Sequence, residues 1–186
     1  MAVPQNIKDL VKQEENEALY LGKAEAEVYP DADGYSAGYG HFLTDEELEK
    51  YPPGTKVPQD QVDAWFEEDI QKSYNAAINQ NNELSTPVDM ARLTSVNYQL
   101  GENWNDSTNN PKAFTKTWDL MKSGDYSGAA EEVLDSEWAT SQTPARAQKF
   151  STILASMTDA QSPVSVDPTP VTPTDSTTPT SAPVEQ

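Results

Sequence analysis

The sequence contains no cysteine, a single histidine and no long run of apolar residues. Without thiols the chain can build neither a disulfide framework nor a thiolate metal site, and one histidine argues against a histidine-built zinc centre. No stretch approaches the length needed to span a bilayer. The N-terminal residues MAVPQNIKDL also lack the apolar centre of a secretory signal. We therefore expect no metal, no membrane span and no signal peptide.

Positive charge is scarce, because 12 lysines and arginines stand against 31 aspartates and glutamates and the formal net charge is −19. A nucleic-acid-binding surface needs clustered lysine or arginine to neutralise phosphates, and the sequence has no such cluster. An acidic surface favours solubility but carries little information about the fold. The composition therefore argues against nucleic acid as a partner.

The chain changes character after Met157. Residues 158–186 are rich in proline, threonine, serine and aspartate, and they contain no aromatic and no basic residue. Such a segment cannot bury enough apolar area to offset the entropy lost on ordering. We predict one folded domain, residues 1–157, followed by a disordered acidic tail, residues 158–186.

Helical periodicity dominates the predicted domain. Apolar residues at helical spacing mark a first helix that ends with Glu14 and Glu15. Thr86 followed by Pro87 is typical of a helix N-terminus, with a hydroxyl cap and a proline in the first turn. After a short helix at 45–50, the remaining helices are predicted from Gln59 onward and over 86–100, 114–123, 126–134 and 143–157.

The segment YPDADGYSAGYGH, residues 29–41, has a different pattern. Its glycines and alternating aromatic residues predict a short, half-buried hairpin, and a hairpin followed by clustered helices indicates an α+β architecture. Asp31 and Ser36 then stand on a stiff element, where a carboxylate and a hydroxyl could hold a water molecule. In the alternative interpretation these polar residues are merely solvated.

His41 and Asp69 form a second candidate contact. Asp69 falls on the apolar stripe of the helix that starts at Gln59, where a carboxylate needs a partner. The only histidine of the chain ends the predicted hairpin. We predict a buried or half-buried ion pair between these two residues, which raises the pKa of His41.

Three blocks of the sequence resemble, in order, the phage-type lysozymes of glycoside hydrolase family 24. They are the helix 7–15 that ends in a glutamate, the segment YPDADGYSAGYGHFLT (29–44), and SVNYQLGE (95–102) together with 113–150, which contains WATSQTPARA. The resemblance implies a lysozyme-like fold with a small N-terminal antiparallel sheet lobe and a helical C-terminal lobe, joined by a long helix. It also implies a glycosidase that needs no cofactor.

The same resemblance implies a catalytic set. Glu15 takes the place of the general acid, Arg146 orients it, and Asp31 and Ser36 hold the attacking water in an inverting reaction. In the family the acid lies nine residues before the aspartate, which here is Gly22. Because packing sets the phase of a helix, we prefer Glu15 and place about seven extra residues between it and the hairpin.

Gln99, Phe114 and Trp138 are weaker candidates for binding or supporting the substrate. Tryptophan is more often a core residue than a sugar platform, and Gln99 could simply hydrogen-bond it. Each catalytic candidate also has a non-catalytic interpretation. Glu15 would then be a solvated residue at a helix end, Asp31 a turn residue, and Ser36 a small strand residue.

Two functions remain open from the sequence. One is a muramidase that cleaves the β-1,4 bond between N-acetylmuramic acid and N-acetylglucosamine in bacterial peptidoglycan. The other is a catalytically degenerate lysozyme-fold protein that serves in a virion or binds the cell wall. We expect a monomer, located in the host cytoplasm before lysis or in the virion, with other virion proteins as candidate partners of the tail.

Overall fold

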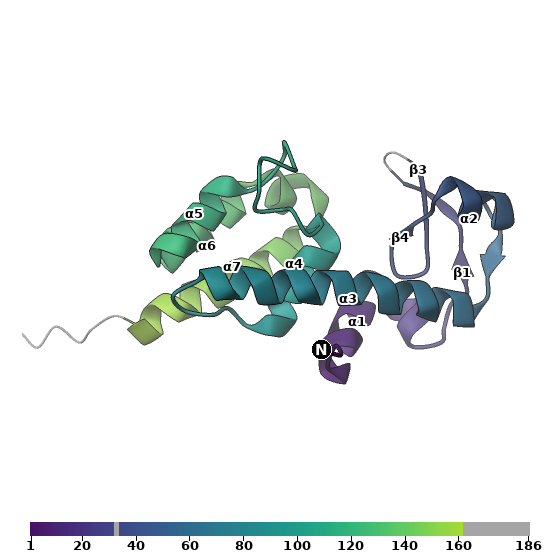
Figure 1. Ribbon diagram of the computed structural model, residues 1–186, viewed down its shortest axis with the longest axis horizontal. Helices are drawn as coiled ribbons and strands as arrows, with labels where there is room; N and C mark the ends of the chain where they lie inside the picture. The colour runs from purple at the N-terminus through teal and green to yellow at the C-terminus, as the bar shows by residue number, and fades with distance from the viewer. Residues whose placement is uncertain (32–33, 162–186) are drawn as a thin grey trace, which may run out of the picture.

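A long helix joins a lobe of short strands to a lobe of helices in the computed structural model, which describes residues 1–31 and 34–161 (Figure 1). This helix, α3, spans Gln59–Glu83. The first helix, α1 (Gln5–Tyr20), lies beneath its middle. The α+β class and the two-lobed lysozyme-like arrangement predicted from the sequence are confirmed.

The strand lobe holds two small antiparallel sheets. The predicted hairpin forms the larger one, in which β2 (Tyr29–Asp31), β3 (Gly34–Ala37) and β4 (His41–Phe42) pair in that order. The other sheet pairs β1 (Ala26–Glu27) with β5 (Lys56–Val57). The sequence analysis did not identify this second pair, because two-residue strands leave no periodic signal.

Helix α2 follows the larger sheet. It spans Asp45–Lys50, as the sequence predicts. A capping box closes its start, because the Thr44 side chain accepts from the backbone of Glu47 while the Glu47 side chain accepts from the backbone of Thr44. Glu47 is thereby held in a fixed place beside the hairpin.

The helical lobe contains the rest of the described chain. Its helices are α4 (Met90–Leu100), α5 (Thr115–Ser123), α6 (Tyr126–Asp135), the π-helical turn η1 (Trp138–Gln142) and α7 (Pro144–Gln161). Helix α6 packs against both α5 and α7. The positive φ of 83° at Gly124 ends α5, because a left-handed residue at that position suits glycine best.

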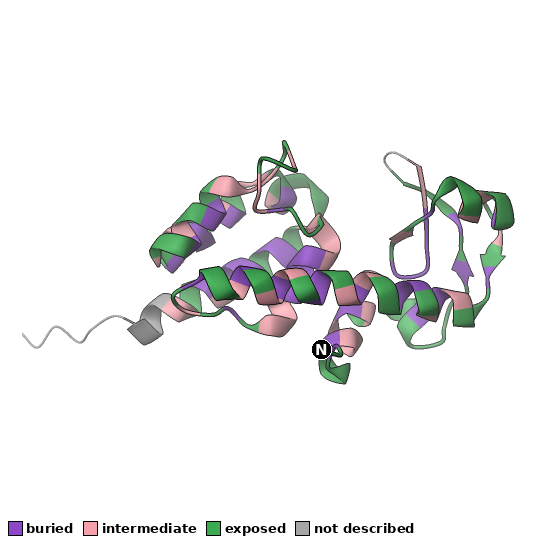
Figure 2. Cartoon of the chain, in the orientation of Figure 1, coloured by how far each residue is buried: buried purple, intermediate pink, exposed green. Residues whose placement is uncertain are grey.

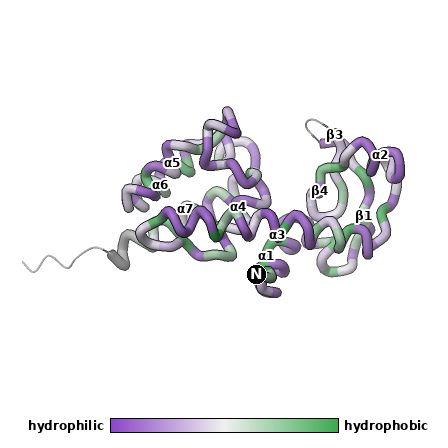
Figure 3. Tube along the Cα trace, in the orientation of Figure 1, coloured by the Kyte–Doolittle hydropathy of each residue, from purple (hydrophilic) through white to green (hydrophobic). Residues whose placement is uncertain are grey.

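Two apolar clusters hold the molecule together, one in each lobe. The first packs α1 and the start of α3 against the sheets, and the second fills the helical lobe around Trp104 and Phe150. Figure 2 shows buried and exposed positions alternating along α3, and Figure 3 shows that α2 and much of α3 are hydrophilic. Both clusters touch α3, so this helix fixes the lobes relative to each other.

Helix α1 breaks at Asn16, whose φ of −152° and ψ of 84° are not helical. The Asn16 side chain donates to the carbonyl of Gly38 at 3.3 Å and accepts from the backbone of Leu19 at 3.1 Å. It thus starts a second helical segment while binding the turn between β3 and β4. Glu15 consequently stands at the end of the first helical segment, against the hairpin.

Three details of the helical lobe differ from the sequence-based expectation. Helix α4 begins at Met90 rather than at Thr86, with Asp89 as its cap. The reason is that the Asn81 side chain binds both the backbone N–H and the carbonyl of Val88 at 2.9 Å, which keeps this segment out of the helix. Leu134, expected to point inward, is 39% exposed.

The third difference concerns the boundary of the domain. Helix α7 continues to Gln161, four residues past the predicted end at 157. The predicted disordered tail otherwise lies outside the described residues. Its proline-rich, apolar-poor composition still predicts that it adds nothing to the core.

We therefore expect that deleting residues 162–186 leaves folding intact. The melting temperature of the shortened chain should stay within about two degrees of the full-length value. Calorimetry on the two proteins in the same buffer measures the difference. A drop of ten degrees would mean that the tail packs on the domain.

Candidate active site

Glu15 and Arg146 lie in contact although they are far apart in the sequence. Arg146, in the first turn of α7, donates from Nη1 to Glu15 Oε1 at 2.6 Å. The Glu15 side chain is 18% exposed and that of Arg146 is 10% exposed. The structure thus brings the sequence-predicted acid to its predicted partner, at the junction of α1 with the helical lobe.

The surroundings of Glu15 favour its protonated form. Burial raises the pKa of Glu15, and the neighbouring charge of Glu14 raises it further, while the Arg146 guanidinium works in the opposite direction. The net result is a raised pKa. Gly40, with φ of +90°, approaches the same carboxylate, and a Cβ at this position would lie 3.9 Å from Glu15 Oε2.

Glu14 has a different role that the sequence analysis did not identify. Its side chain is only 6% exposed. Arg92 donates to both of its oxygens at 2.8 and 3.0 Å, Ser95 donates at 2.6 Å, and Lys149 donates at 3.0 Å. Burial opposes ionisation of Glu14, but the hydrogen bonds from Ser95, Arg92 and Lys149 outweigh it and lower the pKa to about 2. Glu14 is therefore a permanent anion that ties α1 to α4 and α7.

Asp31 and Ser36 form the second half of the candidate site. The hydroxyl of Ser36 donates to Asp31 Oδ2 at 2.6 Å, across the β2–β3 ladder. Ser36 is fully buried, whereas Asp31 lies in an exposed strand. The hydroxyl therefore orients the carboxylate, and the carboxylate is the group that solvent can reach.

Tyr29 connects the two halves. The pKa of its phenol is raised by burial, with the negative charges of both Asp31 and Glu15 adding to the effect. A nearby negative charge makes ionisation of a phenol harder. Glu15 from α1 and Asp31 from β2 thus both act electrostatically on Tyr29.

His41 is held between two carboxylates. Its Nδ1 lies 2.7 Å from Asp69 Oδ2, and its Nε2 lies 3.3 Å from the oxygens of Glu47. Trp65 stacks on the imidazole at 4.5 Å between ring centroids and donates from Nε1 to Glu47 at 2.6 Å. The predicted pair of His41 with Asp69 is in contact, and Glu47 is a third member that sequence reasoning missed.

We predict that His41 titrates above its ordinary pKa of 6.5. Burial alone would lower the value, but the bonds and charges of Asp69 and Glu47 raise it. Because the folded pKa is raised, this contribution to stability is complete below about 6.5 and is lost as pH rises through the folded value. An NMR titration of His41 measures the shift, and Asp69→Asn should reduce it. A pKa at or below 6.5 in the parent would contradict the pair.

The weaker candidates gather in the helical lobe. Trp138 is buried and donates from Nε1 to Thr143 at 2.6 Å and to Gln99 at 3.3 Å. Gln99 in turn donates to Thr143, and the ring of Phe114 meets Trp138 edge-on at 6.4 Å. Because Trp138 is only 2% exposed, it supports this cluster and offers no face to a sugar.

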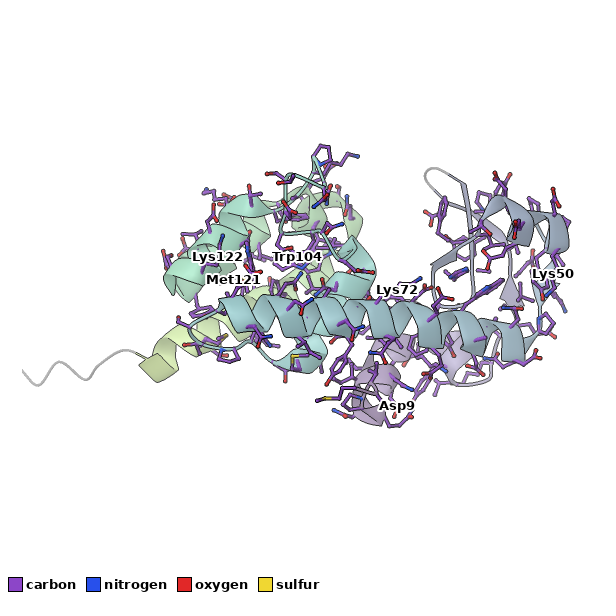
Figure 4. The ribbon with its side chains drawn as sticks, viewed as in Figure 1. Asp9, Lys50, Lys72, Trp104, Met121 and Lys122 are labelled. Atoms are coloured by element: carbon purple, nitrogen blue, oxygen red, sulfur yellow. The ribbon has the colours of Figure 1, made fainter. Side chains whose placement is uncertain are left out.

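Two hollows follow α3 between the lobes. One, of about 410 Å³, is lined by residues that include Gly40, Phe42 and Tyr98. The other, of about 570 Å³, is lined by amide and charged side chains, most of them from α3 and from the loop before α5. Lys72 and Glu102 line both, and Figure 4 shows Lys72 on α3 in the gap between the lobes. An extended polar groove therefore starts beside the hairpin and passes over α3.

The described residues provide little for other chemistries. Within 1–31 and 34–161 the acidic and histidine side chains form no group of three arranged to hold a metal ion. In the same part of the chain no helix is both long enough and apolar enough to cross a bilayer. The side chains that line the groove supply carboxylates, amides, hydroxyls, an imidazole and the ammonium of Lys72.

Comparisons with known proteins place the chain in a family. A family model described as phage lysozyme matches residues 21–150. The peptidoglycan hydrolase gp36 of Pseudomonas phage phiKMV is 31% identical over 143 residues, which is 76% of this chain. The match covers only 15% of that relative, so this chain spans a small part of its length.

The family match does not reach every residue of the candidate site. It begins at residue 21, so it includes Asp31, Ser36 and Arg146 but not Glu15. The choice of Glu15 therefore depends on the phase of α1 and on the 2.6 Å contact with Arg146. By contrast, the alternative acids Glu17 and Glu25 are exposed, and Glu25 pairs with Lys56 on the surface.

Proposed function

Because this chain belongs to the phage lysozyme family, we propose that it is a muramidase acting on bacterial peptidoglycan. The bond cleaved is the β-1,4 link between N-acetylmuramic acid and N-acetylglucosamine. One observation carries the proposal: a half-buried glutamate with a raised pKa is held by Arg146 against the turn of the hairpin that also carries Asp31. Two carboxyl groups with different environments are what glycoside hydrolysis requires.

Glu15 is the proposed general acid. The leaving oxygen of a glycosidic bond is a poor leaving group unless it receives a proton as the bond breaks. A raised pKa keeps a larger fraction of Glu15 protonated near neutral pH, and Arg146 holds the carboxyl in one orientation. Glu14, with its pKa lowered to about 2, stays ionised and cannot take this role.

Asp31 is the proposed partner of the attacking water. Its carboxylate is accessible, and the bond from Ser36 to Oδ2 holds it in an orientation that suits positioning a water molecule toward the anomeric carbon. Ser36 acts through Asp31, because its own hydroxyl is buried. Direct attack by water inverts the anomeric centre, so NMR of the first product formed from a soluble glycan should detect the α-anomer.

The competing function is a lysozyme-fold protein without catalysis. The segment between Glu15 and the hairpin favours this alternative, because an insertion beside a site can disturb its geometry. The contacts of Glu15 with Arg146 and of Ser36 with Asp31 favour catalysis. A zymogram with bacterial walls in the gel separates the two. A cleared band at the mass of the chain supports the muramidase, and no clearing at any pH supports the structural protein.

A further inference from the structure

Two aromatic rings remain exposed beside the Asp31–Ser36 pair. Phe42 is 52% exposed and Tyr29 is 44% exposed. In the described part of the chain most large apolar side chains are buried, and exposed aromatic rings that gather in one place mark binding surfaces.

The register of the sheet places both rings on the face that carries Asp31. Tyr29 pairs with Ser36, and Ser36 pairs with Phe42. Directly paired residues of antiparallel strands project to the same face, and so do residues two apart on one strand. Tyr29 and Phe42 therefore flank Ser36, and Asp31 lies in the next row of the same face.

The ring of Phe42 is held down on the sheet. A Cβ built on Gly34 would lie 2.6 Å from Phe42 Cζ, so the ring lies over the bare backbone of Gly34. Gly34 is the direct ladder partner of Asp31. A larger residue at position 34 would push the ring away. The absence of a side chain there leaves a flat aromatic surface next to the proposed catalytic carboxylate.

Phe42 also belongs to the groove. It lines the 410 Å³ hollow together with Gly40 and Tyr98, and this hollow continues past Lys72 along α3. The ring thus lies between the Asp31 carboxylate and the polar groove. A pyranose ring has an apolar face of C–H groups and a rim of hydroxyls, which suits an aromatic surface bordered by polar side chains.

We propose that Phe42, together with Tyr29, is the platform on which a sugar ring of the glycan strand stacks, so that the bond to be cleaved lies beside Asp31. This inference rests on the proposed muramidase function. Phe42 is a positioning residue: it supplies contact with the substrate and takes no part in proton transfer. Its removal should therefore weaken binding in the ground state and in the transition state alike.

The test measures binding without turnover. Soluble fragments of un-cross-linked peptidoglycan are titrated by calorimetry into Glu15→Gln and into Glu15→Gln carrying Phe42→Ala. We expect Phe42→Ala to weaken binding roughly tenfold and Phe42→Trp to retain the affinity. In the active enzyme Phe42→Ala should raise KM and change kcat little. Tyr29→Ala should weaken binding in the same direction.

Leu21→Ala is the matched control, because Leu21 is 51% exposed but lies in the segment between α1 and β1. It should leave the affinity unchanged. If Glu15→Gln and the double variant with Phe42→Ala bind the fragments with equal affinity, the proposed stacking on Phe42 is wrong, while the proposed muramidase function is unaffected. A parent that neither binds the fragments nor clears walls overturns both. Melting temperatures of all variants, measured in parallel, show that binding is compared between folded proteins.

Discussion

Replacing Glu15 by glutamine should lower the rate of wall hydrolysis by at least ~10²–10⁴-fold, the contribution of a positioned general acid. Glutamine keeps the size and the helical propensity of glutamate but has no proton to transfer. It can still accept the hydrogen bond from Arg146, so the local structure should survive. Clearing of purified walls, followed by turbidity at several pH values, measures the loss.

The controls for this substitution are Glu17→Gln and Glu25→Gln. Both side chains are exposed, and both lie in the segment that separates Glu15 from the hairpin. They should retain most of the activity. If Glu25→Gln abolishes clearing while Glu15→Gln does not, the extra residues lie before the acid and the assignment from helix phase is wrong.

Glu15→Gln should also leave the protein at least as stable as the parent at neutral pH. A carboxyl group whose folded pKa is raised destabilises the fold as the pH rises above its ordinary value of 4.5, and the cost is complete above the folded pKa, since ionisation is harder in the folded state. The neutral amide removes this cost. A functional carboxyl that lowers stability is common at active sites. A large drop in melting temperature would instead indicate that Glu15 is a structural partner of Arg146.

Glu14→Gln is the second large effect, and it should act on stability. The substitution removes the anion that neutralises Arg92, a side chain only 11% exposed. Lowering the pKa of Glu14 from 4.5 to about 2 corresponds to roughly 3 kcal/mol of folding free energy. Breaking a buried ion pair by removing one partner usually costs about as much. We expect the melting temperature to fall by roughly 10 °C at pH 7.

The pH dependence identifies the cause. Because the folded pKa of Glu14 is depressed, its contribution is complete above the ordinary value of 4.5 and is lost as pH falls toward about 2. The difference in unfolding free energy between the parent and Glu14→Gln should therefore shrink through this window. A difference independent of pH would point to packing. Glu17→Gln, on the exposed side of α1, should change stability by less than about 0.5 kcal/mol.

The two adjacent glutamates thus have different roles: Glu14 stabilises the fold, and Glu15 is the proposed general acid. Neighbouring positions on a helix point in different directions, about 100° apart. Glu14 is bound by Arg92, Ser95 and Lys149 and lies 4.0 Å from Arg146 Nε. Glu15 accepts the short bond from Arg146 Nη1 instead. The surroundings of Glu14 stabilise its ionised form, and the surroundings of Glu15 disfavour its ionised form. Glu14 therefore serves the fold, and Glu15, whose pKa is raised, is the one of the two that can serve as an acid.

The sequence by itself determined those features that depend on local patterns. Periodicity located α2, α3, α5 and the start of α7, because their apolar stripes and caps lie close together in the chain. Alternating tyrosines and glycines located the hairpin with Asp31 and Ser36. The isolated aspartate on an apolar stripe was sufficient to suggest that Asp69 would meet His41.

Tertiary structure decided everything that joins distant segments. The start of α4 moved to Met90 because the side chain of Asn81, on another helix, binds both backbone polar groups of Val88. Arg92 and Lys149 turned Glu14 into a structural anion from 78 and 135 residues away. The position of the Phe42 ring followed from the bare backbone of Gly34 across the sheet, on which the ring lies. Local propensity carries no information on such contacts, since they exist only when the packed chain brings the partners together.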